Sequence, residues 1–283
     1  MFQNSGAEAN EAALKLARKY QGLGKHGVVS AYKSFHGRTM ATLAATGQPE
    51  KHAPFMPLPE GFKHAEWNNL DSFEEAIDQT TGAILVEPIQ GEGGVVIPPE
   101  GYLKAVADIA KKNNILFICD EIQAGLGRSG KLFAHQYEDV RPDMVIIGKA
   151  LSGGFYPVSA VLADKEIMLT IKPGEHGSTF GGNPLAAAVA VSALEVIEDE
   201  KLVERSQEMG EYFIEKLRAI DSPHIKEVRG RGLWIGFVLD VPARPYCVKL
   251  KEEGILCKET HEHIIRIAPP LIITKDEIDW AME

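Results

Sequence analysis

The sequence predicts an α/β fold in which a mostly parallel sheet is flanked by helices. Short apolar runs alternate with longer amphipathic segments, and such runs are typical of strands buried on both faces. Residues 100–114 lie between two of these runs and carry apolar residues at helical spacing, as a crossover helix does. The predicted strands cover residues 27–32, 82–88, 115–121, 143–149 and 157–163.

Near residue 200 the alternation of apolar runs and amphipathic segments gives way to a charged amphipathic helix followed by short apolar runs. This change predicts a second, smaller domain of the α+β class. We expect a large domain of residues 1–199 and a small domain of residues 200–283. In a parallel sheet ligands bind beyond the carboxyl ends of the strands, so functional residues are expected just after each run. The remaining predicted elements are helices at 184–197, 201–219 and 245–253, and apolar runs at 232–239 and 264–271.

Composition narrows the class of function. The 283 residues carry a formal net charge of −10, which disfavours nucleic acid or an anionic membrane surface as a partner. No apolar run has the roughly 18 residues that a membrane helix needs. Three cysteines at scattered positions favour a reducing compartment, and we expect the cytoplasm. A small metabolite is therefore the expected ligand.

Residues 119–131, CDEIQAGLGRSGK, partly match two nucleotide-binding motifs. A dinucleotide motif should follow its strand directly, but residues 121–124 intervene before the first glycine. A phosphate-binding loop needs a hydroxyl after its lysine, but Leu132 follows Lys131. We expect the glycines to form a tight turn beside an active site instead.

Asp120 and Lys149 end two successive predicted strands. A buried carboxylate needs a cationic partner, and Lys149 could supply it as a direct ion pair. Alternatively a cofactor lies between them, with an aldehyde bound to Lys149 and a ring nitrogen kept protonated by Asp120. Pyridoxal phosphate has both groups.

Such a cofactor also needs a phosphate site, an aromatic contact and an anchor for the substrate carboxylate. Ser5, Gly6 and Ala7 begin a predicted helix, where free backbone amides favour an anion. Phe35 and Arg38 follow the strand at 27–32 and offer a ring and a guanidinium. Each feature alone has an ordinary structural explanation, so only their combination indicates the cofactor.

Six motifs in a fixed order resemble the class III, or ω-amino acid, aminotransferases, and the resemblance covers essentially the whole chain. This resemblance implies pyridoxal phosphate as cofactor and the fold type I architecture, a mostly parallel sheet flanked by helices with a smaller carboxyl-terminal domain. The motifs are NSGAEA, FHGRT, EPIQGEGG, DEIQAGLGRSG, GKALSGG and GSTFGGNP.

The resemblance implies roles in cofactor binding. Lys149 holds the aldehyde and moves a proton once the substrate displaces it, and Asp120 pairs with the ring nitrogen. Phe35 stacks on the ring and Gln123 approaches the 3′-oxygen. The phosphate is expected at Ser5, Gly6 and Ala7.

The resemblance also implies how substrates bind. Arg38 holds the distal carboxylate of the substrate. Glu92 and Arg266 act as a switch, paired when the amine donor binds and separated when 2-oxoglutarate binds. Thr179 reaches the phosphate in the other subunit, which implies a homodimer with shared active sites.

The resemblance leaves the amine donor open. Residues 4–100 are similar to acetylornithine aminotransferases, whereas the chain from about residue 140 is similar to ornithine δ-aminotransferases. We expect transfer of the δ-amino group of ornithine to 2-oxoglutarate, giving glutamate 5-semialdehyde and glutamate. Alternatives are acetylornithine as donor, another ω-amino acid aminotransferase or an aminomutase, and an inactive remnant. Compared with the family, we expect the amino-terminal region to be missing from this chain.

Other polar residues are interpreted structurally. Glu87 is expected to be a buried hydrogen-bonding residue that positions its neighbours, and Cys119 a core residue facing away from Asp120. His261 and His263 have no suitably spaced carboxylates or thiols beside them, so no metal site is expected.

Overall fold

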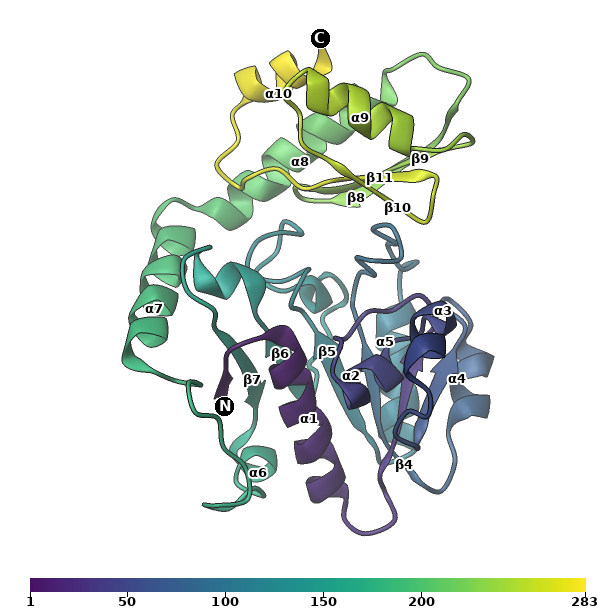
Figure 1. The fold of residues 1–283 in the computed structure, drawn as a ribbon, viewed down its shortest axis with the longest axis vertical. Helices are drawn as coiled ribbons and strands as arrows, with labels where there is room; N and C mark the ends of the chain where they lie inside the picture. Colours follow the sequence, from purple (N-terminus) through teal and green to yellow (C-terminus); the bar gives the residue numbers. More distant parts are fainter. The chain divides into compact units, whose positions relative to one another are not determined.

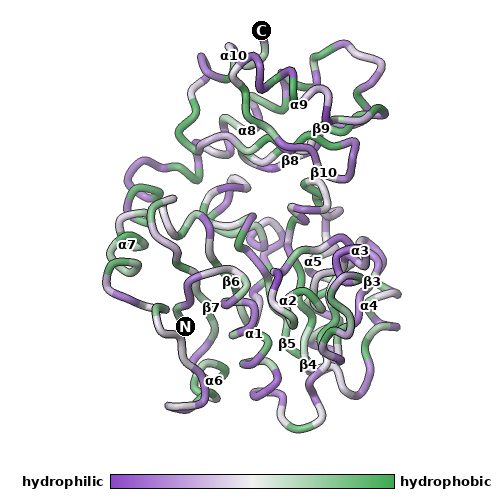
Figure 2. Tube along the Cα trace, viewed as in Figure 1, coloured by the Kyte–Doolittle hydropathy of each residue, from purple (hydrophilic) through white to green (hydrophobic).

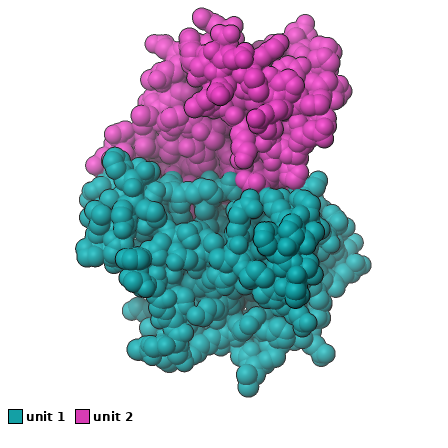
Figure 3. All heavy atoms as spheres, in the orientation of Figure 1, with its two compact units in different colours: residues 1–88, 98–123, 135–195 teal, residues 89–97, 124–134, 196–283 magenta.

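The computed structural model describes residues 1–283 and divides into two compact units, coloured separately in Figure 3. Unit 1 comprises Met1–Pro88, Pro98–Gln123 and His135–Glu195, and unit 2 comprises Ile89–Ile97, Ala124–Ala134 and Val196–Glu283. Residues 89–97 and 124–134 therefore pack with the carboxyl-terminal part of the chain. The division of the sequence into domains 1–199 and 200–283 stays a prediction.

Unit 1 is built on a seven-stranded sheet of order β1-β7-β6-β5-β4-β2-β3 (Figure 1). Strands β2, β3, β4, β5 and β6 pair in parallel. At one edge β7 pairs antiparallel with β6, and β1 pairs antiparallel with β7. The prediction of a mostly parallel sheet is confirmed. The bounds are β1 Phe2–Gln3, β2 Gly27–Ala31, β3 Phe62–Ala65, β4 Thr81–Val86, β5 Leu116–Asp120, β6 Met144–Ile147 and β7 Ser159–Ala163.

Helices cover both faces of this sheet because alternate strand residues point to opposite sides. Leu116 and Ile118 of β5 pack in the cluster formed with α1, whereas Phe117 and Cys119 pack in the cluster formed with α4 and α5. Cys119 is fully buried, so its prediction as a core residue is confirmed. Figure 2 shows hydrophobic residues along these central strands and polar residues over the short helix α3.

The helices of unit 1 begin and end at recognisable signals. Helix α1 has Ser5 as its N-cap in a capping box with Glu8, and α5 ends at Lys112 with Asn113 as its C-cap, inside the range 100–114 predicted from the sequence. The bounds are α1 Gly6–Gln21, α2 Met40–Ala45, α3 Pro49–His52, α4 Leu70–Ala76, α5 Tyr102–Lys112 and α6 Lys165–Met168, with short 3₁₀ turns at Ala53–Phe55, Ala134–Glu138 and Lys149–Ser152. Helix α7 (Pro184–Asp199) has its last residues in unit 2.

Unit 2 is built on a four-stranded antiparallel sheet of order β10-β11-β9-β8. Helix α8 packs closely on it, since a Cβ on Gly210 would lie 2.0 Å from the carbonyl oxygen of Gly232, and only glycine fits. The prediction of a smaller α+β unit is confirmed. The bounds are α8 Leu202–Arg218, β8 Ile225–Arg231, β9 Trp234–Leu239, α9 Arg244–Glu252, β10 Lys258–Thr260, β11 Ile264–Ile267 and α10 Lys275–Met282.

The glycine-rich loop also lies in unit 2. Gly127 and Gly130 have φ of +89° and +82°, and no helix begins after them. A Cβ on Gly232 would lie 2.4 Å from the nitrogen of Gly130, so the turn packs tightly. The loop is thus a compact turn, as predicted, rather than a nucleotide motif. None of the helices combines the length and hydrophobicity that crossing a bilayer requires.

Candidate functional site

Asp120 is the last residue of β5 and lies 4% exposed at the carboxyl edge of the parallel sheet. Because side chains alternate along β5, it faces the same side as Ile118, toward α1. It is in register with Ile146 of the neighbouring strand β6. The chain therefore holds a carboxylate at the edge where ligands of parallel sheets bind.

Three donors bind the Asp120 carboxylate. Its Oδ2 accepts from Asn10 Nδ2 at 3.0 Å and His36 Nδ1 at 2.9 Å, and its Oδ1 accepts from the Ile122 amide at 3.1 Å. Lys149 is not among these partners, so the direct ion pair that the sequence left open is not formed.

None of these donors is a lysine or an arginine. His36 Nδ1 faces the carboxylate, and His36 Nε2 is buried without a hydrogen-bond partner. A buried carboxylate without a lysine or arginine partner suits a ligand that brings its own positive charge, as a protonated pyridine nitrogen does.

Lys149 follows β6 at the same edge of the sheet and begins a short 3₁₀ turn. Its side chain is exposed, and its φ of +40° lies in the left-handed region that non-glycine residues rarely adopt. Backbone strain of this kind is concentrated at functional sites, where the surrounding fold imposes it. The role of Lys149 in binding the cofactor aldehyde stays a prediction.

The first turn of α1 has backbone amides without an acceptor where the sequence predicts an anion site, and the binding of an anion there stays a prediction. The amides of Gly6 and Ala7 have no acceptor, and a Cβ on Gly6 would lie 2.9 Å from Cδ1 of Ile122. Glu8 occupies the neighbouring donors, accepting from the amides of Asn4 and Ser5. Burial raises the pKa of Glu8, but the hydrogen bonds from Asn4 and Ser5 outweigh it and hold that pKa below its ordinary value.

Glu87 connects two predicted cofactor residues. It is 3% exposed, and its two carboxylate oxygens accept from the Phe35 amide at 3.0 Å and from Gln123 Nε2 at 3.4 Å. Its prediction as a buried residue that positions its neighbours is confirmed. The guanidinium carbon of Arg38 lies 5.5 Å from the centroid of the Phe35 ring, with Lys51 Nζ 5.0 Å from the same centroid. Arg38 thus lies beside the Phe35 ring, and its binding of a substrate carboxylate stays a prediction.

Glu92 and Arg266 meet within unit 2. Arg266 Nη1 lies 3.2 Å from Glu92 Oε1 and 3.4 Å from the Gly91 carbonyl oxygen. The Arg266 and Glu92 side chains are 19% and 29% exposed, so the pair is neither isolated from solvent nor fully open to it. An arginine paired with a partly exposed acid is consistent with the predicted switch, which stays a prediction.

Thr179 does not join these residues. It is exposed on the loop before α7 and lines a hollow of about 310 Å³ together with Gln3, Asn4 and Glu8. Nearby, His176 contacts Gln3 Nε2 and Lys15 Nζ, which connects this loop to the first residues of the chain and to α1. That Thr179 serves a second subunit stays a prediction.

The sequence did not single out Asn10 or His36, the two side chains that bind Asp120. Asn10 had a detectable signal, since it is a polar residue on the stripe of α1 that is otherwise apolar and buried. His36 stands next to Phe35 in a motif already singled out. Burial of both could have been inferred, but not their common partner.

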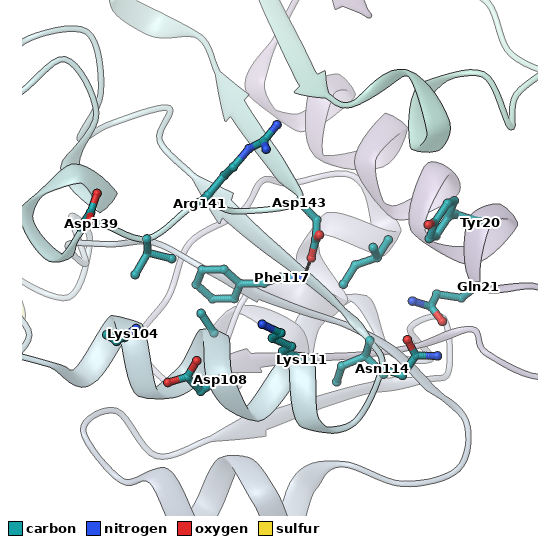
Figure 4. Close-up of a pocket in the computed structure, with 14 residues that line it drawn as sticks. Tyr20, Gln21, Lys104, Asp108, Lys111, Asn114, Phe117, Asp139, Arg141 and Asp143 are labelled. Atoms are coloured by element: carbon teal, nitrogen blue, oxygen red, sulfur yellow. Dashed lines mark hydrogen bonds between the residues drawn. The ribbon is translucent and has the colours of Figure 1, made fainter.

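A separate hollow of about 420 Å³ lies at the opposite end of β5 from Asp120 (Figure 4). Its lining includes Phe117, Lys111, Asp108 and Asp143, and contains none of the predicted site residues. Because both acidic and basic side chains line this hollow, it favours neither an anionic nor a cationic ligand.

The profile of the family described as "Aminotransferase class-III" matches residues 1–283. An ornithine aminotransferase of Exiguobacterium sp. is 55% identical, and ornithine aminotransferase 2 of Staphylococcus aureus 56% identical, the alignments covering 99% of this chain and 71% and 72% of those proteins.

Solved structures of aminotransferases are also similar to this chain. The ornithine aminotransferase of Toxoplasma gondii ME49 superposes with a TM-score of 0.95 at 42% identity, over 99% of this chain and 70% of that one. An acetylornithine aminotransferase of Elizabethkingia anophelis gives a TM-score of 0.86 at 43% identity, over 100% and 71%. Another Toxoplasma gondii structure is described as having pyridoxal phosphate at partial occupancy in its active site.

Proposed function

The chain belongs to the class-III aminotransferase family, and from this premise we propose that it transfers the δ-amino group of ornithine to 2-oxoglutarate. The products are glutamate 5-semialdehyde and glutamate. Relatives named ornithine aminotransferase, at 55% and 56% identity over nearly the whole chain, support this donor. The contact of Glu92 with Arg266 at 3.2 Å is the observation that carries the proposal. While the two side chains are paired, the charge of Arg266 would be neutralised and the cationic donor could bind. Once they separate, Arg266 would bind the second carboxylate of 2-oxoglutarate.

Class-III aminotransferases depend on pyridoxal phosphate, and the residues present fit it. When bound, this group supplies an aldehyde that condenses with amines and a ring that withdraws electrons from the carbon losing its proton. Asp120 would hold the proton on the ring nitrogen, since no lysine or arginine is among its hydrogen-bond partners. Phe35 would cover the ring, and Gln123, held by Glu87, would approach the 3′-oxygen. Ser5, Gly6 and Ala7 would bind the phosphate at the start of α1.

Lys149 would bind the aldehyde and, once replaced by the donor amine, carry a proton as general base and then as general acid. Its exposure at the edge of the sheet is compatible with both tasks. Arg38 would hold the distal carboxylate of the substrate with a forked pair of hydrogen bonds. Glu92 would neutralise Arg266 while the donor is bound and release it for the second carboxylate of 2-oxoglutarate.

A homodimer would complete the site, with Thr179 reaching the phosphate of the partner. Support comes from apolar side chains left exposed along α7 and beside it, where Leu185 is 57%, Val191 55% and Phe180 66% exposed. A measured molar mass in solution tests this, and a strictly monomeric active protein would contradict it. A cytoplasmic location is supported by three free cysteines.

Parallel assays of ornithine and acetylornithine with 2-oxoglutarate test the donor. We expect the cyclising product of ornithine to be trapped by 2-aminobenzaldehyde. Activity with acetylornithine alone would favour the second candidate, which the structure from Elizabethkingia anophelis supports at 43% identity. Turnover without any oxo acid would instead indicate an aminomutase.

The inactive-remnant alternative has its own test. The purified chain is incubated with pyridoxal phosphate, and the yellow absorbance of the lysine-bound cofactor is recorded before and after borohydride. A band that borohydride bleaches is expected, and its absence would support the remnant.

A further inference from the structure

Asn10 is a fully buried polar residue in helix α1. Its neighbours on the buried stripe of the helix are Ala9, Ala13 and Leu14. Burying an amide among apolar residues is costly unless its hydrogen bonds are made. The side chain therefore needs an explanation beyond packing.

Both hydrogens of the Asn10 amide are used, and they go to two separate parts of the candidate site. Asn10 Nδ2 donates to the Gly6 carbonyl oxygen at 3.1 Å and to Asp120 Oδ2 at 3.0 Å. Both partners are pure acceptors, so the opposite amide orientation would place Oδ1 against two oxygens. The contacts thus dictate how the amide is turned.

Asn10 Oδ1 is buried and has no partner. If the residue only filled space, alanine would avoid this unsatisfied acceptor at no cost in helix propensity. Asn113 provides the contrast, because its Nδ2 donates at 2.9 Å to the Ile109 carbonyl four residues earlier, with no carboxylate involved. The bond to Asp120 is what distinguishes Asn10.

We propose that Asn10 is a positioning residue that fixes the Asp120 carboxylate relative to the first turn of α1. Gly6 belongs to the predicted phosphate site and Asp120 to the predicted ring-nitrogen site, so one rigid amide sets the spacing between the two ends of the cofactor site. As a neutral donor Asn10 orients Asp120 without compensating its charge, which is kept for the ring nitrogen. The inference rests on the proposed cofactor but not on the choice of amine donor.

A double-mutant cycle tests whether Asn10 acts through Asp120. The dissociation constant of pyridoxal phosphate is measured, without substrate, for the wild type, Asn10→Ala, Asp120→Ala and the double variant. We expect Asn10→Ala to weaken binding about tenfold in the wild-type background, as loss of a hydrogen bond to a charged group does. In the Asp120→Ala background the same change should have less than about a twofold effect. Equal losses in both backgrounds, or no loss in either, would overturn the proposal.

Asn10→Asp keeps the shape of the side chain and serves if the alanine variant does not fold. It places a second carboxylate against Asp120, so one of the two must take up a proton. We expect cofactor binding to weaken by more than about tenfold, and increasingly so from pH 6 to pH 8. Binding equal to the wild type at pH 8 would refute the inference.

Asn113→Ala is the matched control and should leave the dissociation constant unchanged. The cofactor measurements are also separate from the proposed activity. A wild-type chain that binds pyridoxal phosphate but does not use ornithine would refute ornithine as the amine donor. The double-mutant cycle would still test the role of Asn10 in that case. A wild-type chain that binds no cofactor would overturn the cofactor assignment and this inference with it.

Discussion

Arg266 Nη1 lies 3.2 Å from Glu92 Oε1, although 174 residues separate the two in the sequence. The side chains come from β11 and from the loop after β4, both within unit 2. Because each remains partly exposed, the pair can separate when a second anion competes for the arginine.

Arg266→Lys tests this relationship. Lysine cannot grip a carboxylate with two parallel hydrogen bonds, so we expect the KM for 2-oxoglutarate to rise about tenfold or more, with the KM for ornithine changing less than about threefold. Steady-state kinetics with each substrate varied measure both values. Arg244→Lys, in an exposed pair with Glu259, is the control and should change neither. Equal increases for both substrates would contradict the switch.

Asp120→Ala and Asp120→Asn separate charge from hydrogen bonding. Alanine leaves the donors of Asn10, His36 and Ile122 unpaired, and we expect a loss of about 2–4 kcal/mol in the unfolding free energy of the cofactor-free protein. Asparagine keeps an acceptor, so it should unfold close to the wild type while losing nearly all turnover. Urea unfolding and activity assays provide the two readouts. An active Asp120→Asn variant would argue against a role for the charge.

Lys149→Ala and Lys149→Gly should both lose turnover and the absorbance of lysine-bound cofactor. Their stabilities should differ, because glycine adopts the φ of +40° at this position without strain. We expect Lys149→Gly to be more stable than Lys149→Ala by about 1 kcal/mol in urea unfolding. Ala150→Gly, at a neighbour with negative φ, should instead destabilise the protein. If alanine proved the more stable substitution, Lys149 would not be strained.

His64 makes the stability of unit 1 depend on pH. Burial, and to a smaller extent the neighbouring imidazoles of His52 and His36, lowers the pKa of His64 from 6.5 to about 4. The unfolded chain therefore binds a proton near pH 6.5 that the folded chain binds only near pH 4, so stability falls as pH falls through this window. The upper limit of the loss is about 3 kcal/mol.

Urea unfolding between pH 4.5 and 7 measures this effect. The His64→Asn variant keeps a donor for the Ser30 hydroxyl, which lies 2.8 Å from His64 Nδ1, and should show a flatter pH profile than the wild type. His26→Asn, at an exposed histidine, is the control. Identical profiles for the wild type and His64→Asn would rule out His64 as the source.

The strands and helices could be predicted because their signals are local. Apolar runs predicted β2, β4 and β5 to within two residues at each end, and apolar residues at helical spacing predicted the helix at 100–114 that contains α5. The strand predicted at residues 143–149 is shorter in the structure, because β6 spans Met144–Ile147. Gly148 and Lys149 leave the strand because the backbone there turns into the strained conformation.

The chemistry of the site was likewise recognisable in residues near the ends of strands. Asp120 and Lys149 could be singled out because parallel strands bring their carboxyl ends to one edge. The role of Glu87 followed from an acid at the end of a buried strand, and its bonds to Phe35 and Gln123 confirm that interpretation.

By itself the sequence indicated the central strands of the sheet, several of the helices, and the edge of the sheet where the candidate site residues lie. Only the tertiary structure decided which partners hold those groups. Asn10 and His36 lie 110 and 84 residues from Asp120, and they meet it because α1 packs on one face of the sheet and the loop after β2 returns to its edge. Hydrogen bonds between such distant residues depend on packing in three dimensions, whereas periodicity and capping depend on neighbours along the chain.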